Sequence, residues 1–219
     1  MRNQPAISEE EQEILERKHV LVLGCGGLGG TVMEHLVRLG VGEITAVDGD
    51  RLEASNLNRQ ILSTVENLGA YKTEAARIRA YSINPDLRFH SVTEFFNQHN
   101  ADTLLEGVDL VMDGLDNDVD RLLLEQFCER KNVPIVHGAV SGWLVQVGVV
   151  MPGSGMLTAL YGNRKSGGDS SCLSVTVGFC AAVQCAEAVK LLCGRPCDLE
   201  GKLLTADLER MVLELLDFR

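Results

Sequence analysis

Residues 19–29, H-V-L-V-L-G-C-G-G-L-G, decide the fold, because they join an apolar run directly to a glycine-rich turn. The run 19–23 predicts a buried strand, and the spacing of apolar residues over 28–38 predicts a helix after the turn. Turns with G-x-G-x-x-G spacing in this context let the backbone approach a phosphate, and the helix N-terminus offers free N–H groups. The alternative is a tight corner without a ligand. We predict a nucleotide-binding turn made by Gly24, Gly26, Gly27 and Gly29.

A second apolar strand, 43–47, ends in Asp48, about 20 residues beyond the glycine turn, where a carboxylate can accept hydrogen bonds from ribose hydroxyls. Asp50 is an alternative for this role, and either residue could be a solvated loop acid. The cluster S-N-L-N-R-Q at 55–60 follows, and then Lys72. A dinucleotide does not need these extra polar and cationic groups, whereas a triphosphate that loses pyrophosphate does. The predicted phosphate contacts are Asn56, Arg59, Gln60 and Lys72, although Arg59 and Lys72 also suit a solvated surface.

The sequence D-G-L-D-N at 113–117 follows the apolar strand 108–112. The carboxyl ends of strands in a doubly wound sheet share one crevice, so we expect Asp116 near the glycine turn. A carboxylate beside a triphosphate suits Mg²⁺, which takes few protein oxygens and leaves its other positions to water and phosphate. The alternative is that Asp116 is the N-cap of a helix starting at Asn117.

Strands and helices alternate along the chain, which predicts an α/β, Rossmann-like, doubly wound and mostly parallel sheet in a single domain over residues 1–219. Two close strands at 203–207 and 212–216 predict an antiparallel C-terminal hairpin. Ser8 is the expected N-cap of a first helix ending at Arg17, with Glu11 completing a capping box. The other expected strands are 87–92, 108–112, 133–137 and 144–150, and the other expected helices are 69–81, 98–105, 117–130 and 173–193.

The charge and hydropathy of the sequence argue against some classes of partner. The net charge is −11 and no basic run exceeds two residues, which argues against nucleic acid. The polar N-terminus is not a secretory signal, and no uninterrupted apolar stretch reaches the roughly 18 residues of a membrane span. We therefore expect a cytoplasmic protein without a membrane partner. The seven cysteines do not form the pattern of a disulfide scaffold, and Cys25, Cys128, Cys180, Cys185 and Cys193 are expected to be buried.

These motifs resemble the ThiF/MoeB/HesA family, the ubiquitin-activating-enzyme-like adenylyltransferases of thiamine and molybdopterin synthesis. The resemblance covers residues 2 to about 195, and S-N-L-N-R-Q with a downstream lysine is its most specific part. It implies that Mg-ATP activates the Gly-Gly C-terminus of a small ubiquitin-like sulfur carrier as an acyl adenylate, with release of pyrophosphate. The motifs are G-C-G-G-L-G at 24–29, V-D-G-D at 47–50, S-N-L-N-R-Q at 55–60, K-T-E at 72–74, I-N-P at 83–85 and D-G-L-D-N at 113–117.

The resemblance also implies roles for single residues. Gly27 would contact the nucleotide and Asp48 the ribose, while the phosphates would be held by Asn56, Arg59 and Lys72. Asp116 would lie near Mg²⁺ with Asn117 beside it. Arg2 resembles an arginine that acts in trans in a homodimer, although the preceding part of that motif is absent.

Several features depart from the family pattern or concern residues outside it. Cys193 and Cys197 have three residues between them and no second pair, so we expect no zinc. Cys172, after the polar segment 161–171, is a candidate acyl acceptor or persulfide site, with burial as the alternative. The segment itself is expected to order on a ligand. His137 is expected to be a satisfied core histidine rather than a base. Trp143 is expected to pack at the start of a strand, with a place in the channel for the carrier's tail as the alternative. Arg164 and Lys165 are expected to be solvated, with contact to an acidic carrier as the alternative.

Other readings of the sequence remain open. An NAD-binding oxidoreductase would explain the glycine turn and Asp48 but not Arg59, Lys72 and Asp116. A non-catalytic nucleotide-binding homologue would keep the pocket without the transfer chemistry. A further interpretation keeps adenylation but makes the acceptor a peptide or a modified nucleoside. The acidic surface argues against tRNA as the acceptor.

Overall fold

A computed structural model describes residues 3–163 and 171–218, and its centre is an eight-stranded sheet in the order β3-β2-β1-β4-β5-β6-β7-β8. The neighbours from β3 to β5 pair in parallel, and those from β5 to β8 pair antiparallel. This confirms the predicted fold class, including the C-terminal hairpin. The strands are β1 (His19–Leu23), β2 (Glu43–Val47), β3 (Arg88–Val92), β4 (Leu110–Asp113), β5 (Ile135–Ser141), β6 (Leu144–Val150), β7 (Lys202–Asp207) and β8 (Val212–Asp217).

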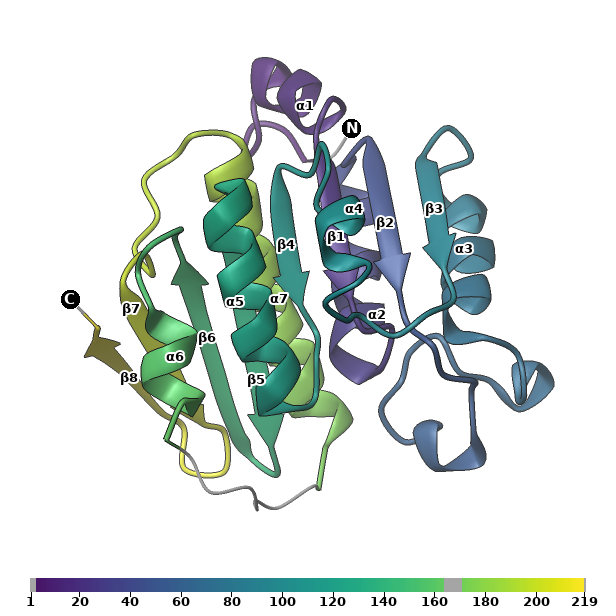
Figure 1. Ribbon diagram of the computed structural model, residues 1–219. Helices are drawn as coiled ribbons and strands as arrows, with labels where there is room; N and C mark the ends of the chain where they lie inside the picture. Colours follow the sequence, from purple (N-terminus) through teal and green to yellow (C-terminus); the bar gives the residue numbers. More distant parts are fainter. Residues whose placement is uncertain (1–2, 164–170, 219) are drawn as a thin grey trace.

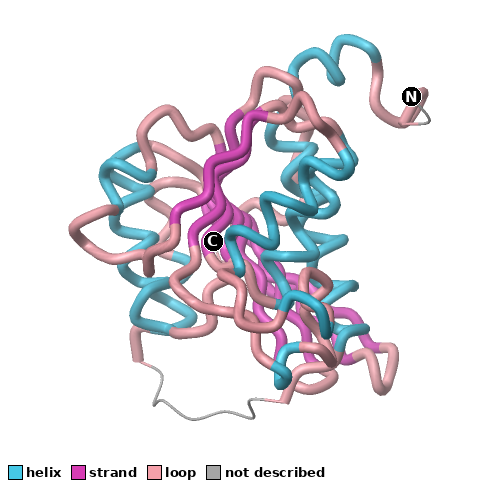
Figure 2. Tube along the Cα trace, turned by 90° about the vertical axis from the view of Figure 1, so that its right-hand side faces the viewer, coloured by secondary structure: helices cyan, strands magenta, loops and turns pink. Residues whose placement is uncertain are grey.

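Helices cover both faces of the sheet (Figures 1 and 2), and a hydrophobic cluster lies on each side. One face carries α2 (Gly27–Leu39), α3 (Lys72–Ile83) and α7 (Ser174–Leu192), and the other carries α4 (Ala101–Leu104), α5 (Asp118–Lys131) and α6 (Met156–Tyr161). The central strand β1 is sandwiched between them, and its last four residues are buried. A continuous apolar run is what such a strand requires.

The two edges of the sheet have different roles. Helix α1 (Glu9–Leu15) and the N-terminus lie at the edge where the parallel strands begin (Figure 1). The predicted capping box is present, because Ser8 accepts from the N–H of Glu11, whose side chain accepts from the N–H of Ser8. The segment 48–71 lies at the opposite edge and contains two short 3-10 helices, η1 (Ala54–Asn56) and η2 (Val65–Asn67), which were not predicted.

Three helices differ from the expectations. Helix α3 begins at Lys72 rather than at residue 69, because Gly69 has φ +86° and Tyr71 forms an isolated bridge with Arg51. Helix α4 is only Ala101–Leu104, because the Asn97 and Asn100 side chains bond to the backbone of 97–99 in a turn. Helix α6 was missed, since six residues are too short to show a helical period.

Helix α7 tests the expectation about membranes. In the part of the chain that the structure describes, it is the one helix that is long and apolar enough to cross a membrane, with a mean hydropathy of 1.5. The uninterrupted-run criterion missed it. Half of that window is buried, and the helix packs against α2, β5 and β6. Burial in the core accounts for its composition, and the absence of a membrane partner stays a prediction.

Candidate functional site

The glycine turn and the loop after β4 touch each other at the carboxyl edge of the sheet. Gly24 has φ +86°, and a Cβ there would lie 2.5 Å from the carbonyl oxygen of Gly114. The N–H of Gly114 donates to the oxygen of Leu23 at 2.9 Å. A Cβ at Gly29 would overlap the oxygen of Gly24, so the turn leaves no room for side chains at either position. The two motifs are therefore neighbours in space, as the shared edge of the strands predicted.

The N-terminus of α2 is open to a phosphate. Its N-cap is Gly26, and no side chain caps the helix. The first turn of a helix leaves its N–H groups without intrahelical partners, and the helix dipole adds positive potential there. The first turn of α2 contains no acidic residue. This end of the helix fits an anionic group.

Asp48 and Lys72 lie together beside the glycine turn. One carboxylate oxygen of Asp48 accepts from the N–H of Cys25 at 2.8 Å, and the other accepts from the N–H of Asp50 at 2.7 Å. The ammonium of Lys72 is 3.7 Å from Asp48 and 2.7 Å from Asp50. Lys72 is only 7% exposed, so it is not a solvated surface lysine. Asp48 still has lone pairs free for further donors, because an ionised carboxylate offers about four acceptor positions.

Residues 55–60 pass alongside the start of α2. A Cβ at Gly27 would lie 3.5 Å from Cγ of Arg59, so the stem of Arg59 packs against the glycine turn. Its guanidinium donates to the oxygen of Ser55 at 3.0 Å and to the side chain of Asn58 at 2.9 Å. These partners lie on its own segment, and the guanidinium makes no ion pair with a carboxylate in the described residues. The group can exchange a backbone oxygen for a phosphate oxygen.

Asn56 and Gln60 are both buried, at 8% and 5% exposure. The Asn56 side chain accepts from the N–H of Glu53 at 2.9 Å and so also shapes the local turn. Gln60 Oε1 has no hydrogen-bond partner, and its Nε2 lies 3.7 Å from where a Cβ on Gly26 would be. A buried amide oxygen without a partner beside the uncapped helix end is a place where a ligand donor or a water fits.

Asp116 is exposed, and its neighbour Asn117 takes the role that the sequence had offered Asp116 as an alternative. Asn117 is the N-cap of α5, because its side chain accepts from the N–H of Asp120 at 2.9 Å. It also donates to the Asp120 carboxylate at 2.8 Å. The N-cap interpretation of Asp116 is therefore wrong, and the amide of Asn117 is already engaged.

A metal cage made by the protein alone is not seen at this edge. Within residues 3–163 and 171–218, no group of three His, Cys, Asp or Glu side chains is placed to hold a metal ion. The exposed carboxylate of Asp116 fits a Mg²⁺ that takes its other ligands from phosphate and water. The expected absence of zinc stays a prediction.

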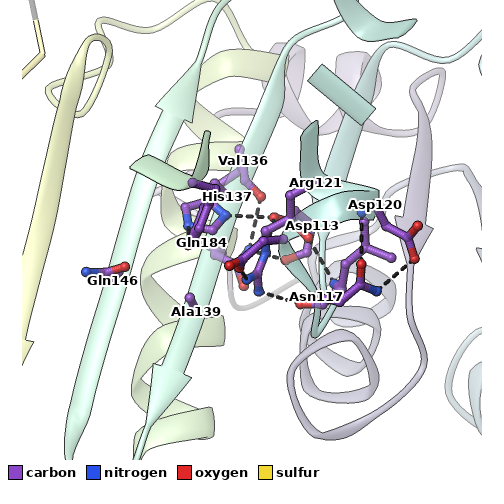
Figure 3. A network of polar contacts seen from close by, with 12 residues as sticks. Asp113, Asn117, Asp120, Arg121, Val136, His137, Ala139, Gln146 and Gln184 are labelled. Atoms are coloured by element: carbon purple, nitrogen blue, oxygen red, sulfur yellow. Dashed lines mark hydrogen bonds and ion pairs between the residues drawn. The ribbon is translucent and has the colours of Figure 1, made fainter. Parts of the chain in front are cut away.

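Behind this loop lies a buried polar network that the sequence did not reveal (Figure 3). Asp113 and His137 are both 0% exposed, and His137 Nδ1 lies 2.7 Å from the Asp113 carboxylate. The other ring nitrogen, Nε2, lies 3.0 Å from the hydroxyl of Tyr161. His137 is thus the satisfied core histidine that was predicted. The sequence indicated the histidine but not its partners Asp113 and Tyr161, because these come from β4 and α6, which are distant along the chain.

Arg121 and Gln184 complete the network. The guanidinium of Arg121 donates to the oxygen of Leu115 at 2.5 Å, and its Nε lies 3.3 Å from Asp113 without hydrogen-bond geometry. Gln184 donates to the backbone oxygens of Asp113 and Val136, each at 3.0 Å. Burial acts to raise the pKa of the Asp113 carboxyl, but Arg121 and His137 outweigh it and hold that pKa below its usual value. Asp113 is an anion in a buried setting.

Other predicted residues are placed as follows. Cys172 is half-buried, its carbonyl accepts from Asn58 at 3.2 Å, and burial raises the pKa of its thiol while Arg59 partly offsets this. Trp143 is 44% exposed, so the packing role was wrong; it lies in the turn before β6. Cys193 is only half-buried, unlike the other four cysteines expected in the core. Arg2, Arg164 and Lys165, with most of the segment 161–171, lie outside the described residues.

One candidate near Asp48 was missed. The ring of Phe95 is 63% exposed and lies against Gly49, where a Cβ would be 2.7 Å from it. An exposed aromatic ring beside a proposed ribose-binding carboxylate can pack against a base. A phenylalanine after a strand carries no such signal in the sequence, and only its position at the carboxyl edge reveals it.

Several known proteins are similar to this chain over most of its length. The model of the ThiF family matches residues 1–218. The SAMP-activating enzyme E1 of Haloferax volcanii is 32% identical over 219 residues, which cover 97% of this chain and 81% of that protein. The sulfur carrier protein adenylyltransferase of Thermus thermophilus is 34% identical over 215 residues, 93% of this chain and 79% of that protein. A crystal structure of E. coli MccB with ATP superposes with a TM-score of 0.78 at 21% identity, over 95% of this chain and 66% of that one, a likeness that shows the fold alone.

Proposed function

The chain belongs to the ThiF family and is an adenylyltransferase, and from that premise we propose that it uses ATP to adenylate the C-terminal glycine carboxylate of a small ubiquitin-like sulfur carrier, releasing pyrophosphate. The proposal includes a carrier of the thiamine or molybdopterin type with a Gly-Gly C-terminus. It also includes a cytoplasmic location and no nucleic-acid or membrane partner. The names of the two relatives, which refer to sulfur-carrier or SAMP activation, support the choice of acceptor.

One observation carries the proposal: Lys72 is buried next to Asp48 at the glycine turn, while the loop holding Asp116 packs against the same turn. A nicotinamide dinucleotide uses the turn and the ribose carboxylate but has no use for a buried ammonium at that position. A triphosphate does, because a cation there offsets charge on the leaving phosphates. The oxidoreductase alternative therefore loses support.

The reaction needs positioning and charge neutralisation more than acid–base chemistry. An oxygen of the carrier's terminal carboxylate attacks the α-phosphorus, the bond to the β-phosphate oxygen breaks, and pyrophosphate leaves with the electron pair. No proton has to be moved at the attacking atom. In the proposed complex Arg59 and Lys72 bind the phosphates, Asp48 accepts from the ribose, and the first turn of α2 donates to a phosphate oxygen. The closeness of Lys72 to Asp48, the packing of the Arg59 stem against Gly27 and the uncapped start of α2 support these roles. Mg²⁺, held by Asp116, would neutralise charge on the phosphates.

We propose a homodimer in which Arg2 acts on the partner's site. Asn3 lines a cavity of about 500 Å³ with Leu39, at the C-terminal end of α2. The glycine turn is at the other end of this 13-residue helix, about 20 Å away. The described chain therefore starts, at Asn3, far from its own glycine turn, which supports action in trans.

The test is ATP–pyrophosphate exchange with candidate Gly-Gly-ended carriers encoded by the same genome. We expect exchange with one of them, and Arg59→Ala or Lys72→Ala should lower the rate by about 10²–10³ while the protein stays folded. Arg77→Ala is the matched control, because the side chain of Arg77 on α3 is 41% exposed and its ion-pair partner is Glu74. Exchange at the wild-type rate in either site variant would remove that residue from the mechanism. ATP binding without exchange for any carrier would indicate the non-catalytic homologue instead.

A further inference from the structure

The residue just before Asp116, Leu115, is hydrogen-bonded through both of its backbone groups to side chains of the buried network. The N–H of Leu115 donates to the Asp113 carboxylate at 2.9 Å. The carbonyl of Leu115 accepts from Arg121 at 2.5 Å. Both backbone groups of Leu115 are thus fixed by side chains that face away from solvent, while Asp116 itself is exposed. The hydrogen bonds of Asp113 and Arg121 to the Leu115 backbone therefore orient the part of the loop from which the Asp116 side chain extends.

The Asp113 carboxylate is in turn held by the imidazole of His137. Because an ionised carboxylate can only accept, Nδ1 of His137 donates to it. In the neutral imidazole, Nε2 then accepts from the hydroxyl of Tyr161 at 3.0 Å. Tyr161 is the last residue of α6, and the ring of Tyr161 also lies 5.1 Å from the Arg121 guanidinium. The contacts form a chain from α6 through β5 and β4 to the loop of Asp116.

Helix α6 is itself anchored at its start. The buried carboxylate of Glu125 on α5 accepts from the N–H groups of Leu157 and Thr158, at 2.7 and 2.8 Å, and from the Thr158 hydroxyl at 2.6 Å. Tyr161 is therefore presented to His137 by a helix fixed at its first turn. None of these groups is free to rearrange without breaking a buried hydrogen bond, which costs about 1–3 kcal/mol.

We propose that His137 is a positioning residue for the metal side of the site, acting through Asp113 and the Leu115 backbone to orient Asp116 toward Mg²⁺ bound with the triphosphate. This inference rests on the proposed function for its ligand. His137 touches neither nucleotide nor metal. The groups that orient a metal ligand typically change metal affinity or activity by 10–100-fold when they are removed. Removal of the His137 imidazole should therefore weaken the effect of Mg²⁺ on the protein while leaving the binding of the nucleotide itself unchanged.

The experiment compares His137→Leu with His137→Asn. Asparagine keeps an N–H donor near the position of Nδ1, whereas leucine removes it. We expect His137→Leu to raise the Mg²⁺ concentration for half-maximal ATP–pyrophosphate exchange by about tenfold. His137→Asn should stay close to wild type. Val136→Ala, a core change on the same strand, is the control for lost stability alone and should leave the Mg²⁺ requirement unchanged.

A second readout does not depend on turnover: the rise in Tm caused by ATP, measured with Mg²⁺ and with EDTA. In His137→Leu the rise in EDTA should be retained and the extra rise with Mg²⁺ reduced. Wild-type Mg²⁺ dependence in His137→Leu, or an equal shift in Val136→Ala, would overturn the proposal. So would a wild-type chain in which Mg²⁺ adds nothing to the effect of ATP. If the wild-type chain shows the Mg²⁺-dependent rise in Tm but no exchange with any carrier, the proposed function is refuted. The role of His137 is then decided by the Tm measurements alone.

Discussion

Two segments border the glycine turn, and they hold their charged side chains in different ways. The cation-side wall, residues 48–72, carries Arg59 and Lys72. The partners of Arg59 are a backbone oxygen and an amide, and those of Lys72 are the exposed carboxylate of Asp50 and the buried carboxylate of Asp48. In the metal-side wall, residues 113–121, the backbone of Leu115 is hydrogen-bonded to the side chains of Asp113 and Arg121, and Asp113 is 0% exposed. One wall is held by contacts that a ligand can replace, and the other by contacts that no ligand reaches.

This difference shows how the site divides its tasks. Phosphate oxygens can replace the partners of Arg59, and Asp50 as a partner of Lys72, at little cost, because those partners are partly hydrated and charge-assisted bonds to phosphate are strong. The loop that carries Asp116 has no such freedom, since the N–H and the carbonyl of the preceding Leu115 are both hydrogen-bonded to buried side chains before any ligand arrives. Preorganised groups do not have to reorganise during the reaction, which is where electrostatic stabilisation is most effective. Variants on the two walls should therefore affect different quantities.

The largest difference is expected for Arg121→Leu on the metal-side wall. It leaves the buried Asp113 carboxylate without its arginine partner, which should lower the free energy of unfolding by about 3–5 kcal/mol in urea denaturation. Arg59→Ala on the cation-side wall should change it by less than about 0.5 kcal/mol, because the guanidinium is only partly buried.

Two further variants make this comparison decisive. Arg130→Leu, an exposed arginine on the same helix, should change stability by less than about 0.5 kcal/mol. Asp113→Asn added to Arg121→Leu removes the uncompensated charge, so the double variant should be less destabilised than the sum of the single ones. Additive effects would mean that the loss comes from packing of the arginine stem, and the two walls would then not differ in the way described.

A smaller effect is expected for Glu125→Gln, which weakens the anchor of α6. The amide keeps one acceptor oxygen but places an NH₂ group against backbone donors, so the free energy of unfolding should fall by about 1–3 kcal/mol. Hydrogen exchange at Leu157 and Thr158 should accelerate. Glu129→Gln, exposed on the same helix, is the control. Unchanged exchange at both amides would show that Glu125 does not hold the start of α6.

The difference between the two walls also explains which parts of the fold and the site could be predicted from the sequence. The glycine turn, Asp48 and Asp116 follow strands that are apolar runs, and the shared carboxyl edge of a doubly wound sheet predicts that they meet. The capping box at Ser8 is a local pattern and was predicted with its partner Glu11. These features depend on spacing along the chain, which a sequence displays directly.

The metal-side network was not predicted, for a physical reason. Asp113, Arg121, His137 and Tyr161 come from four elements, and each residue type alone is more often explained by a cap, a surface charge or a core position. Whether a buried charge is compensated depends on side-chain geometry across the sheet. The choice between Asp116 and Asn117 as N-cap is similar, because it turns on a single backbone residue.

The smallest expected effect concerns Cys172, which lies next to the cation-side wall. Burial raises the pKa of its thiol and the Arg59 charge lowers it in part, so at neutral pH the thiol is protonated. The rate of its alkylation, followed by peptide mass spectrometry, should reach half its maximum at a pH above the value of about 8.5 for a free cysteine. Arg59→Ala should move that pH further upward, because it removes the charge that favours the thiolate, and Arg77→Ala should not. A midpoint below that of free cysteine would contradict this prediction and indicate an activated thiolate, the property that an acceptor of the acyl group requires.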